Sequence, residues 1–155
     1  MIGQLTIPQI NELLQRQVVG RIGCYSNGKV YVVPISYAYD GQDVYCHTHE
    51  GLKLDMMREN PNVCFEVDDL TNMGNWKSVI AWGRFEEIQE GDRHAALRIL
   101  VNRHLPPVPS GIMHLGEGWP FESDSAESLG GIFFKIVLDT RVGKFEETSF
   151  TSISG

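Results

Sequence analysis

Residues 45–61 read Tyr45-Cys46-His47-Thr48-His49-Glu50-Gly51-Leu52-Lys53-Leu54-Asp55-Met56-Met57-Arg58-Glu59-Asn60-Pro61. The first part has the composition of a strand, and the part between Gly51 and Asn60-Pro61 that of a helix. The first turn of a helix presents unpaired backbone N–H groups and about half a positive charge. Thr48 adds a hydroxyl there and Lys53 an ammonium. The stretch therefore predicts an anion site that suits a phosphate.

A β-hairpin is expected directly before this site. Residues Val30 to Tyr39 are rich in aromatic and β-branched side chains, and Asp40-Gly41-Gln42-Asp43 then turns the chain into a strand from Val44 to Thr48. Pro34 removes one donor from the first strand, so this strand is expected to be an edge strand or to carry a bulge. Its open backbone groups could then meet a planar polar ligand.

The remaining elements predict a mainly β barrel with appended helices in a single domain of residues 1–155. Strands outnumber helices and do not alternate with them, which argues against a doubly wound sheet. Gly83 is the expected kink of one long strand. The expected elements are a helix from Thr6 to Gln17, strands from Arg21 to Ser26, Asn62 to Asp69 and Trp76 to Ile88, a helix from Gly91 to His104, and closing strands from Gly131 to Leu138 and Gly143 to Glu147.

Two segments do not fit this pattern. Residues 105–130 are rich in Pro, Gly, Ser and Glu and are too long for a plain connection, so they are expected to form a lid or a long surface loop. Residues 148–155 are rich in Ser and Thr, which predicts a flexible tail.

Composition limits the functions to consider. The 155 residues are 42% hydrophobic, as expected of a packed domain. Their formal net charge of -7 argues against a nucleic-acid partner. No segment reads as a membrane span or a signal peptide, so a cytoplasmic protein is expected. The cysteines Cys24, Cys46 and Cys64 are odd in number and show no metal-binding spacing, which predicts buried free thiols.

Several short motifs in fixed order resemble the FMN-binding split-barrel proteins related to pyridoxamine 5'-phosphate oxidase, and most closely the nitroimidazole-resistance branch. The resemblance extends from about Gly20 to Ile88. It implies a six- to seven-stranded antiparallel split barrel with FMN as cofactor. The motifs are Val33-Pro34-Ile35, Tyr45-Cys46-His47-Thr48, Gly51-Leu52-Lys53, and Asn60-Pro61-Asn62-Val63-Cys64-Phe65-Glu66-Val67.

The candidate cofactor residues fall into three groups. The phosphate is assigned to Thr48, Gly51, Leu52 and Lys53. The resemblance implies that the flavin ring lies on the strand edge formed by Val33, Pro34, Ile35 and Ser36. It also implies a two-fold homodimer in which the long strand of one subunit completes the pocket of the other, and the matching residues are Trp76, Lys77, Ser78 and Arg84.

His47 has three open interpretations. The resemblance places a histidine at this position near the flavin. His47 is therefore a candidate cofactor-binding residue and the candidate catalytic residue, which would donate a hydrogen bond to a substrate. It is equally well explained as a core histidine. His47 and His49 share a strand face and could chelate a metal with His104 or His114, but the ligand spacing of a zinc site is missing and no metal is expected.

The C-terminus lacks the arginine motif with which pyridoxamine 5'-phosphate oxidases grip their substrate, which makes that reaction less favoured. The leading hypothesis is an FMN-dependent oxidoreductase that passes electrons from NADH or NADPH to a small oxidised acceptor such as a nitroaromatic. A non-catalytic module that stores or senses flavin is the alternative. A haem-binding split barrel is the third.

Overall fold

The computed structural model of the chain describes residues 1–103 and 130–149. The expected lid at 105–130, apart from Gly130, and the expected tail beyond Ser149 lie outside the described residues. The strands are β1 (Ile2–Gln4), β2 (Val19–Ser26), β3 (Lys29–Tyr39), β4 (Asp43–Thr48), β5 (Asn62–Asn72), β6 (Asn75–Glu87) and β7 (Ile132–Glu146). The helices are α1 (Ile7–Arg16), α2 (Leu52–Glu59), the 3-10 turn η1 (Glu90–Asp92) and α3 (Arg93–Val101).

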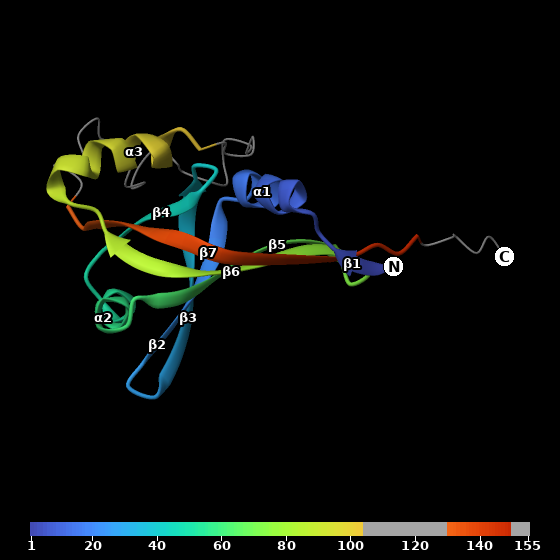
Figure 1. Ribbon diagram of the computed structural model, residues 1–155, viewed down its shortest axis with the longest axis horizontal. Coiled ribbons are helices and arrows are strands. Elements are labelled where there is room, and N and C mark those ends of the chain that lie inside the picture. Colours follow the sequence, from blue (N-terminus) through green and yellow to red (C-terminus); the bar gives the residue numbers. More distant parts are fainter. Residues whose placement is uncertain (104–129, 150–155) are drawn as a thin grey trace, which may run out of the picture.

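The described strands form one antiparallel sheet that closes on itself. Its seven strands follow the order β1-β7-β4-β3-β2-β5-β6, and a further pairing of β6 with β7 completes the barrel. In the view of Figure 1, α1 and α3 lie above β6 and β7, and α2 lies below them. The sequence-based prediction of an antiparallel split barrel with appended helices is confirmed.

The C-terminal strand differs from the prediction. Two closing strands were expected, but β7 is one continuous strand of 15 residues. It stays continuous because the bend is absorbed by a bulge opposite Gly83, where the register with β6 shifts and Asp139 becomes the extra residue. A Cβ at Gly83 would lie 2.2 Å from the carbonyl oxygen of Val137, so the close approach of the two strands requires glycine. The predicted kink at Gly83 is confirmed.

Strand β3 changes partners along its length. Residues 29–36 pair with β2 alone, and Tyr37, Ala38 and Tyr39 pair with β4. Pro34 therefore lies in a segment with one open edge, as its missing N–H predicts. The β2–β3 turn is formed by Asn27 and Gly28, which both have positive φ.

Two apolar clusters hold the helices on the barrel. Helices α1 and α2 contribute Leu13, Leu14 and Met57 to the main core, where Tyr37 and Phe65 meet edge to face. A smaller cluster lies under α3, which buries Ala96, Leu97 and Leu100 against Ala38 and Phe133. Helix α3 is shorter than the predicted Gly91 to His104, because η1 occupies the start of that range. Within the described ranges, each helix is too short or too polar to cross a membrane.

Candidate functional site

The barrel splits between β3 and β4. The two strands pair from Tyr39–Val44 to Tyr37–Cys46, where the ladder ends. The next pairs in register would be Ser36–His47 and Ile35–Thr48, but β4 continues beside β7 and then turns into α2. The open edge of Val33, Pro34, Ile35 and Ser36 is therefore on the side of β3 from which β4 departs. The split therefore lies between two groups of residues that were predicted to share a ligand. One is the strand edge 33–36, and the other is Thr48 with residues 51–53.

Helix α2 begins at this split without a side-chain cap. Its N-cap residue Gly51 has extended backbone and makes no side-chain hydrogen bond to the first turn. A Cβ at Gly51 would meet only the His49 carbonyl oxygen, at 4.0 Å, so there is space beside this residue. The amides of Leu52 and Lys53 are thus at the positive end of an uncapped helix, where an anion is stabilised.

Lys53 lies half-buried in the first turn of α2. Burial lowers the pKa of its ammonium, and the neighbouring thiols of Cys46 and Cys24 oppose this shift. Burial also raises the pKa of both thiols, so they are neutral at pH 7 and do not neutralise the lysine. Among the described residues, no carboxylate lies within 4.0 Å of Lys53. A bound anion would compensate this cation.

Thr48 is the last residue of β4 and is buried, with its side chain on the barrel side of the strand. Its hydroxyl donates to the carbonyl of His49 at 3.4 Å, which is a long and weak hydrogen bond. The hydroxyl can therefore exchange this partner for a better acceptor at the cost of a small free energy. Its assignment to a phosphate remains a prediction.

His47 lies on the opposite face of β4, beneath α3. Its ring is 4.7 Å from that of Phe133, and its Nε2 is 2.9 Å from the carbonyl oxygen of Gly130. Because a carbonyl can only accept, Nε2 carries the proton. Burial is the main cause that lowers the pKa of His47. The hydrogen bond to Gly130 raises this pKa, and the nearby His49 and Arg93 lower it further. The imidazole is therefore neutral at pH 7.

The metal interpretation of His47 and His49 has no third ligand in the described part of the chain. The two rings meet edge to face, with 5.3 Å between their centroids. Within residues 1–103 and 130–149, no group of three or more His, Cys, Asp and Glu is placed to hold a metal ion. His104 and His114, the partners considered from the sequence, lie outside the described residues.

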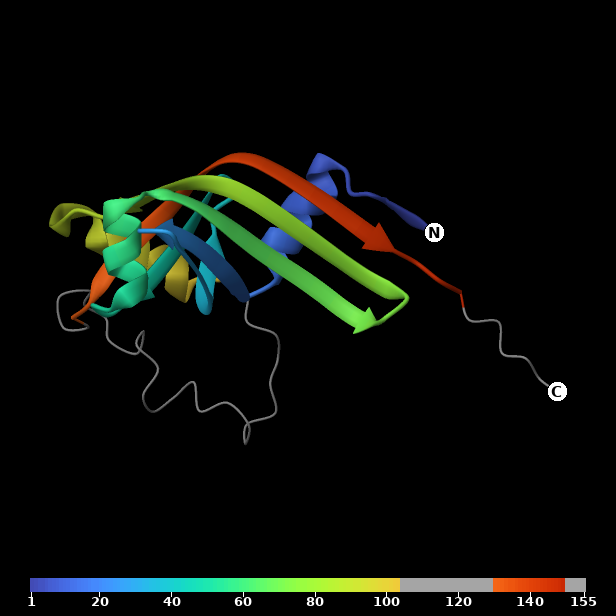
Figure 2. The ribbon, with the colours of Figure 1, turned by 90° about the horizontal axis from the view of Figure 1, so that it is seen from below.

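The β6 residues are not brought to the split within one chain. The first turn-side residues of β6 after Asn75 are Trp76, Lys77 and Ser78. Here β6 and β1 both pair with the end of β7, and Trp76 donates to Glu146 at 2.9 Å. Figure 2 shows that this end of the β5–β6 hairpin extends away from α2. Arg84 is exposed near the other end of β6, where it pairs with Asn62. A role for Trp76, Lys77 and Ser78 at the cofactor thus requires a second subunit.

Two arginines near the split were missed by the sequence analysis. Arg103, just after α3, donates to the hydroxyl of Ser36 and, at 3.1 Å, to the carbonyl of Tyr37. Burial lowers the pKa of its guanidinium. Arg58, in the last turn of α2, donates to Glu50 in the loop before this helix. The contact between Arg103 and Ser36 spans 67 residues, so no local pattern in the sequence could have indicated it.

The chain is similar to known proteins in sequence and in structure. Residues 7–113 match the model of the family described as pyridoxamine 5'-phosphate oxidase. The chain belongs to this family. An uncharacterized protein of Rhizobium meliloti (strain 1021) has a similar sequence. It is 28% identical over 131 residues, which cover 81% of this chain and 83% of that protein.

Two solved structures are similar to this chain. A FAD-binding protein from Mesorhizobium loti is 28% identical and superposes with a TM-score of 0.73 over 95% of this chain and 99% of its own. A candidate 5-nitroimidazole antibiotic resistance protein from Bacteroides thetaiotaomicron has a TM-score of 0.72 at 20% identity, over 94% of this chain and 87% of its own. At that identity, the second likeness is one of fold.

Proposed function

We propose that the chain binds a flavin at the split between β3 and β4, with FMN as the cofactor. The observation that carries the proposal is the convergence of an uncapped helix, the half-buried Lys53 and the open edge of Val33 to Ser36. A phosphate at the start of α2 would be held by the amides of Gly51 and Leu52 and by the Lys53 ammonium. The similar protein from Mesorhizobium loti is named as FAD-binding, which supports a flavin.

The phosphate contacts alone are too weak to retain the cofactor. Three charge-assisted hydrogen bonds contribute about 1.5 to 3 kcal/mol each, while micromolar binding requires about 8 kcal/mol after ordering costs are subtracted. Burial of the ring must supply the remainder. The backbone of residues 33–36 offers it N–H and C=O groups that β4 leaves unpaired.

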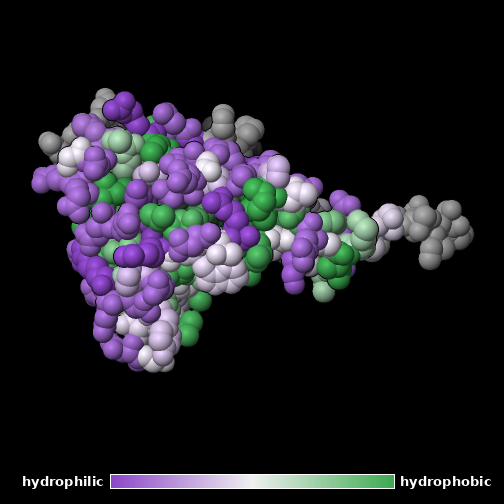
Figure 3. Space-filling model, viewed as in Figure 1, coloured by the Kyte–Doolittle hydropathy of each residue, from purple (hydrophilic) through white to green (hydrophobic). Residues whose placement is uncertain are grey.

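The proposed functional unit is a homodimer. Outward-facing side chains form an apolar row, because the register aligns Val32 with Gly23, Gly23 with Cys64, and Cys64 with Trp82. The Arg21–Glu66 ion pair lies in the adjacent row. Figure 3 shows apolar surface among hydrophilic surface over β6 and β7. A second copy would cover this face and bring its own β6 to the split. The exposed apolar residues of this face are Tyr25, Val30, Val32, Ile80, Trp82 and Val142.

The proposed reaction transfers electrons from NADH or NADPH to a small oxidised acceptor such as a nitroaromatic compound. A bound flavin supplies the redox chemistry. The chain would hold the phosphate with Lys53, orient the ring on residues 33–36 and exclude water by burial. His47, neutral and with its Nε2 proton directed at Gly130, lies on the α3 side of β4 and would donate to an acceptor only after exchanging this partner.

A non-catalytic flavin-binding module is the second candidate, and one observation favours it. The residues assigned to the phosphate and to the ring edge, Val33 to Ser36, Thr48 and Gly51 to Lys53, include no carboxylate and no imidazole. His47 points to the other face of β4. A site built in this way can store or sense flavin without a residue that moves protons.

Spectroscopy and titration test the proposal. The purified protein is expected to show a flavin spectrum, to bind FMN more tightly than riboflavin, and to elute as a dimer in gel filtration with light scattering. A Soret band would instead identify a haem protein. Anaerobic mixing with NADH or NADPH separates the two candidates, since an oxidoreductase bleaches its flavin much faster than free FMN is bleached. Equal affinity for FMN and riboflavin would contradict the phosphate site, and FAD binding tighter than FMN would change the cofactor.

A further inference from the structure

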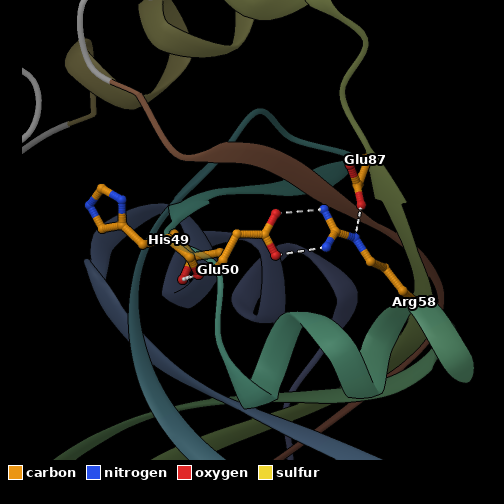
Figure 4. A network of polar contacts seen from close by, with 5 residues as sticks. His49, Glu50, Arg58 and Glu87 are labelled. Atoms are coloured by element: carbon orange, nitrogen blue, oxygen red, sulfur yellow. Dashed lines mark hydrogen bonds and ion pairs between the residues drawn. The ribbon is translucent and has the colours of Figure 1, made fainter.

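Arg58 links three elements around the start of α2. From the last turn of this helix, its Nη1 and Nη2 atoms donate to the two carboxylate oxygens of Glu50 at 2.8 and 3.1 Å. Its Nε donates to Glu87 at the end of β6. Figure 4 shows this fork, with Glu50 on one side of the guanidinium and Glu87 on the other. The loop between β4 and α2 is thereby tied to both α2 and β6.

Glu50 occupies a position from which it could block the anion site. It directly precedes Gly51, the N-cap of α2. A carboxylate next to a helix N-terminus is attracted to the unpaired N–H groups, and Lys53 adds a full positive charge to that attraction. In Figure 4, Glu50 instead extends along α2 toward Arg58, while His49 points the other way. The bidentate contact holds the Glu50 carboxylate away from the positive end of the helix.

We propose that Arg58 is a positioning residue that prevents Glu50 from competing with the cofactor phosphate at the start of α2. This inference rests on the proposed function, because it requires that a phosphate binds there. Arg58 does not touch the phosphate itself. It neutralises Glu50 and Glu87 and fixes the loop 49–51, so that Gly51, Leu52 and Lys53 meet an anion from outside the chain.

The test compares FMN with riboflavin, which lacks the phosphate. In Arg58→Gln, the freed Glu50 is expected to weaken FMN binding about tenfold, the scale of one charge-assisted contact, while riboflavin affinity stays within about twofold. The double variant Glu50→Gln/Arg58→Gln removes the competitor, and its FMN affinity is expected to return to within about threefold of the wild type. A merely structural role of Arg58 predicts no such recovery.

A matched control is available on the other side of the barrel. Arg16 of α1 also bridges two carboxylates, Glu12 and Asp69, and Arg16→Gln is expected to leave both affinities unchanged. Should Arg58→Gln fail to fold, Arg58→Lys takes its place, since lysine keeps the charge but not the fork. An about threefold loss of FMN affinity that Glu50→Gln relieves would again support the proposal.

The outcomes separate the two proposals. If wild-type protein binds FMN and riboflavin equally, the phosphate site itself is refuted. If the wild type prefers FMN but the double variant remains as weak as Arg58→Gln, or riboflavin affinity falls in parallel, only the role of Arg58 is refuted.

Discussion

Helices α1 and α2 both pack their apolar side chains into the main core, but their first turns are built differently. In α1, the hydroxyl of Thr6 accepts from the amide of Gln9 at 3.3 Å, and the side chain of Gln9 accepts from the amide of Thr6 at 2.8 Å. In α2, Gly51 provides no side-chain cap, and the nearby Lys53 is half-buried. The first turn of α1 is capped by its own side chains, whereas the first turn of α2 has no side-chain cap.

This difference separates stability from binding. Changes in α1 are expected to alter the free energy of unfolding and to leave cofactor affinity intact. Changes at the start of α2 are expected to do the reverse, because an uncapped helix end contributes little to the stability of the unliganded protein. Each of the following variants tests one side of this contrast.

The largest effect is expected from Leu13→Ala in α1. Leu13 is fully buried, and its truncation leaves a cavity in the main core. The free energy of unfolding should fall by about 2 to 5 kcal/mol in urea titrations, while the affinity of the folded protein for FMN is unchanged. Gln15→Ala on the exposed face of α1 is the control and should stay within about 0.5 kcal/mol of the wild type.

Gly51→Asp would make α2 resemble α1. The extended φ of 171° at this position is open to any residue, and the aspartate can cap the first turn. We expect stability to rise by a few tenths of a kcal/mol and FMN affinity to fall about a hundredfold, since the new carboxylate occupies the anion site. Gly51→Ala adds bulk without a charge and should lower FMN affinity less than Gly51→Asp does. Unchanged FMN affinity in Gly51→Asp would place the phosphate elsewhere.

Lys53→Met should weaken FMN binding at least about tenfold, through loss of one contact of about 1.5 to 3 kcal/mol, with little change in stability. The wild type should also show a pH dependence. Because burial lowers the pKa of Lys53 below 10.5, its charge is lost at a lower pH than that of an ordinary lysine. The ratio of FMN to riboflavin affinity should therefore fall as pH rises through this lowered pKa. In Lys53→Met the ratio should be low and independent of pH above neutrality.

The smallest effect is expected from Thr6→Ala. Loss of the α1 cap should lower the free energy of unfolding by about 1 kcal/mol, because the amide of Gln9 loses its acceptor. Thr6→Ser keeps the hydroxyl and should recover most of this loss. Calorimetric melting with and without FMN would show an equal stabilisation by FMN in wild type and variant, and a smaller stabilisation in the variant would contradict the separation of the two helices.

The sequence predicted the parts of the fold that are written in local patterns. The helix expected to start at Thr6 does start there, with Thr6 as its cap, and Pro34 lies in a segment with the open edge that its missing N–H predicted. Gly83 was identified as a kink because glycine in a long strand indicates close approach. The β3–β4 hairpin and the helix after it were also expected from local patterns, and both are present; the assignment of their residues to a cofactor stays a prediction.

Long-range features were beyond these patterns. Nothing near Arg103 indicates Ser36, and nothing near Arg58 indicates Glu87, because both contacts depend on how distant elements pack. The bulge at Asp139 similarly joins two predicted strands into β7, since its cause lies on β6 and not on β7 itself. The face of β4 on which His47 lies is set by its pairing with Phe133 of β7. Alternation along β4 shows only that His47 and Thr48 lie on opposite faces, not which of the two faces the barrel interior.

Strand β7 also determines when this molecule can fold. It pairs with β4, β6 and β1, so the last described strand contacts the first residues of the chain. On the ribosome, β2 to β6 can pair as they emerge, but the barrel stays open along two edges until β7 has been released. Closure is thus a late event with high contact order, and it should limit the refolding rate more than any hairpin does.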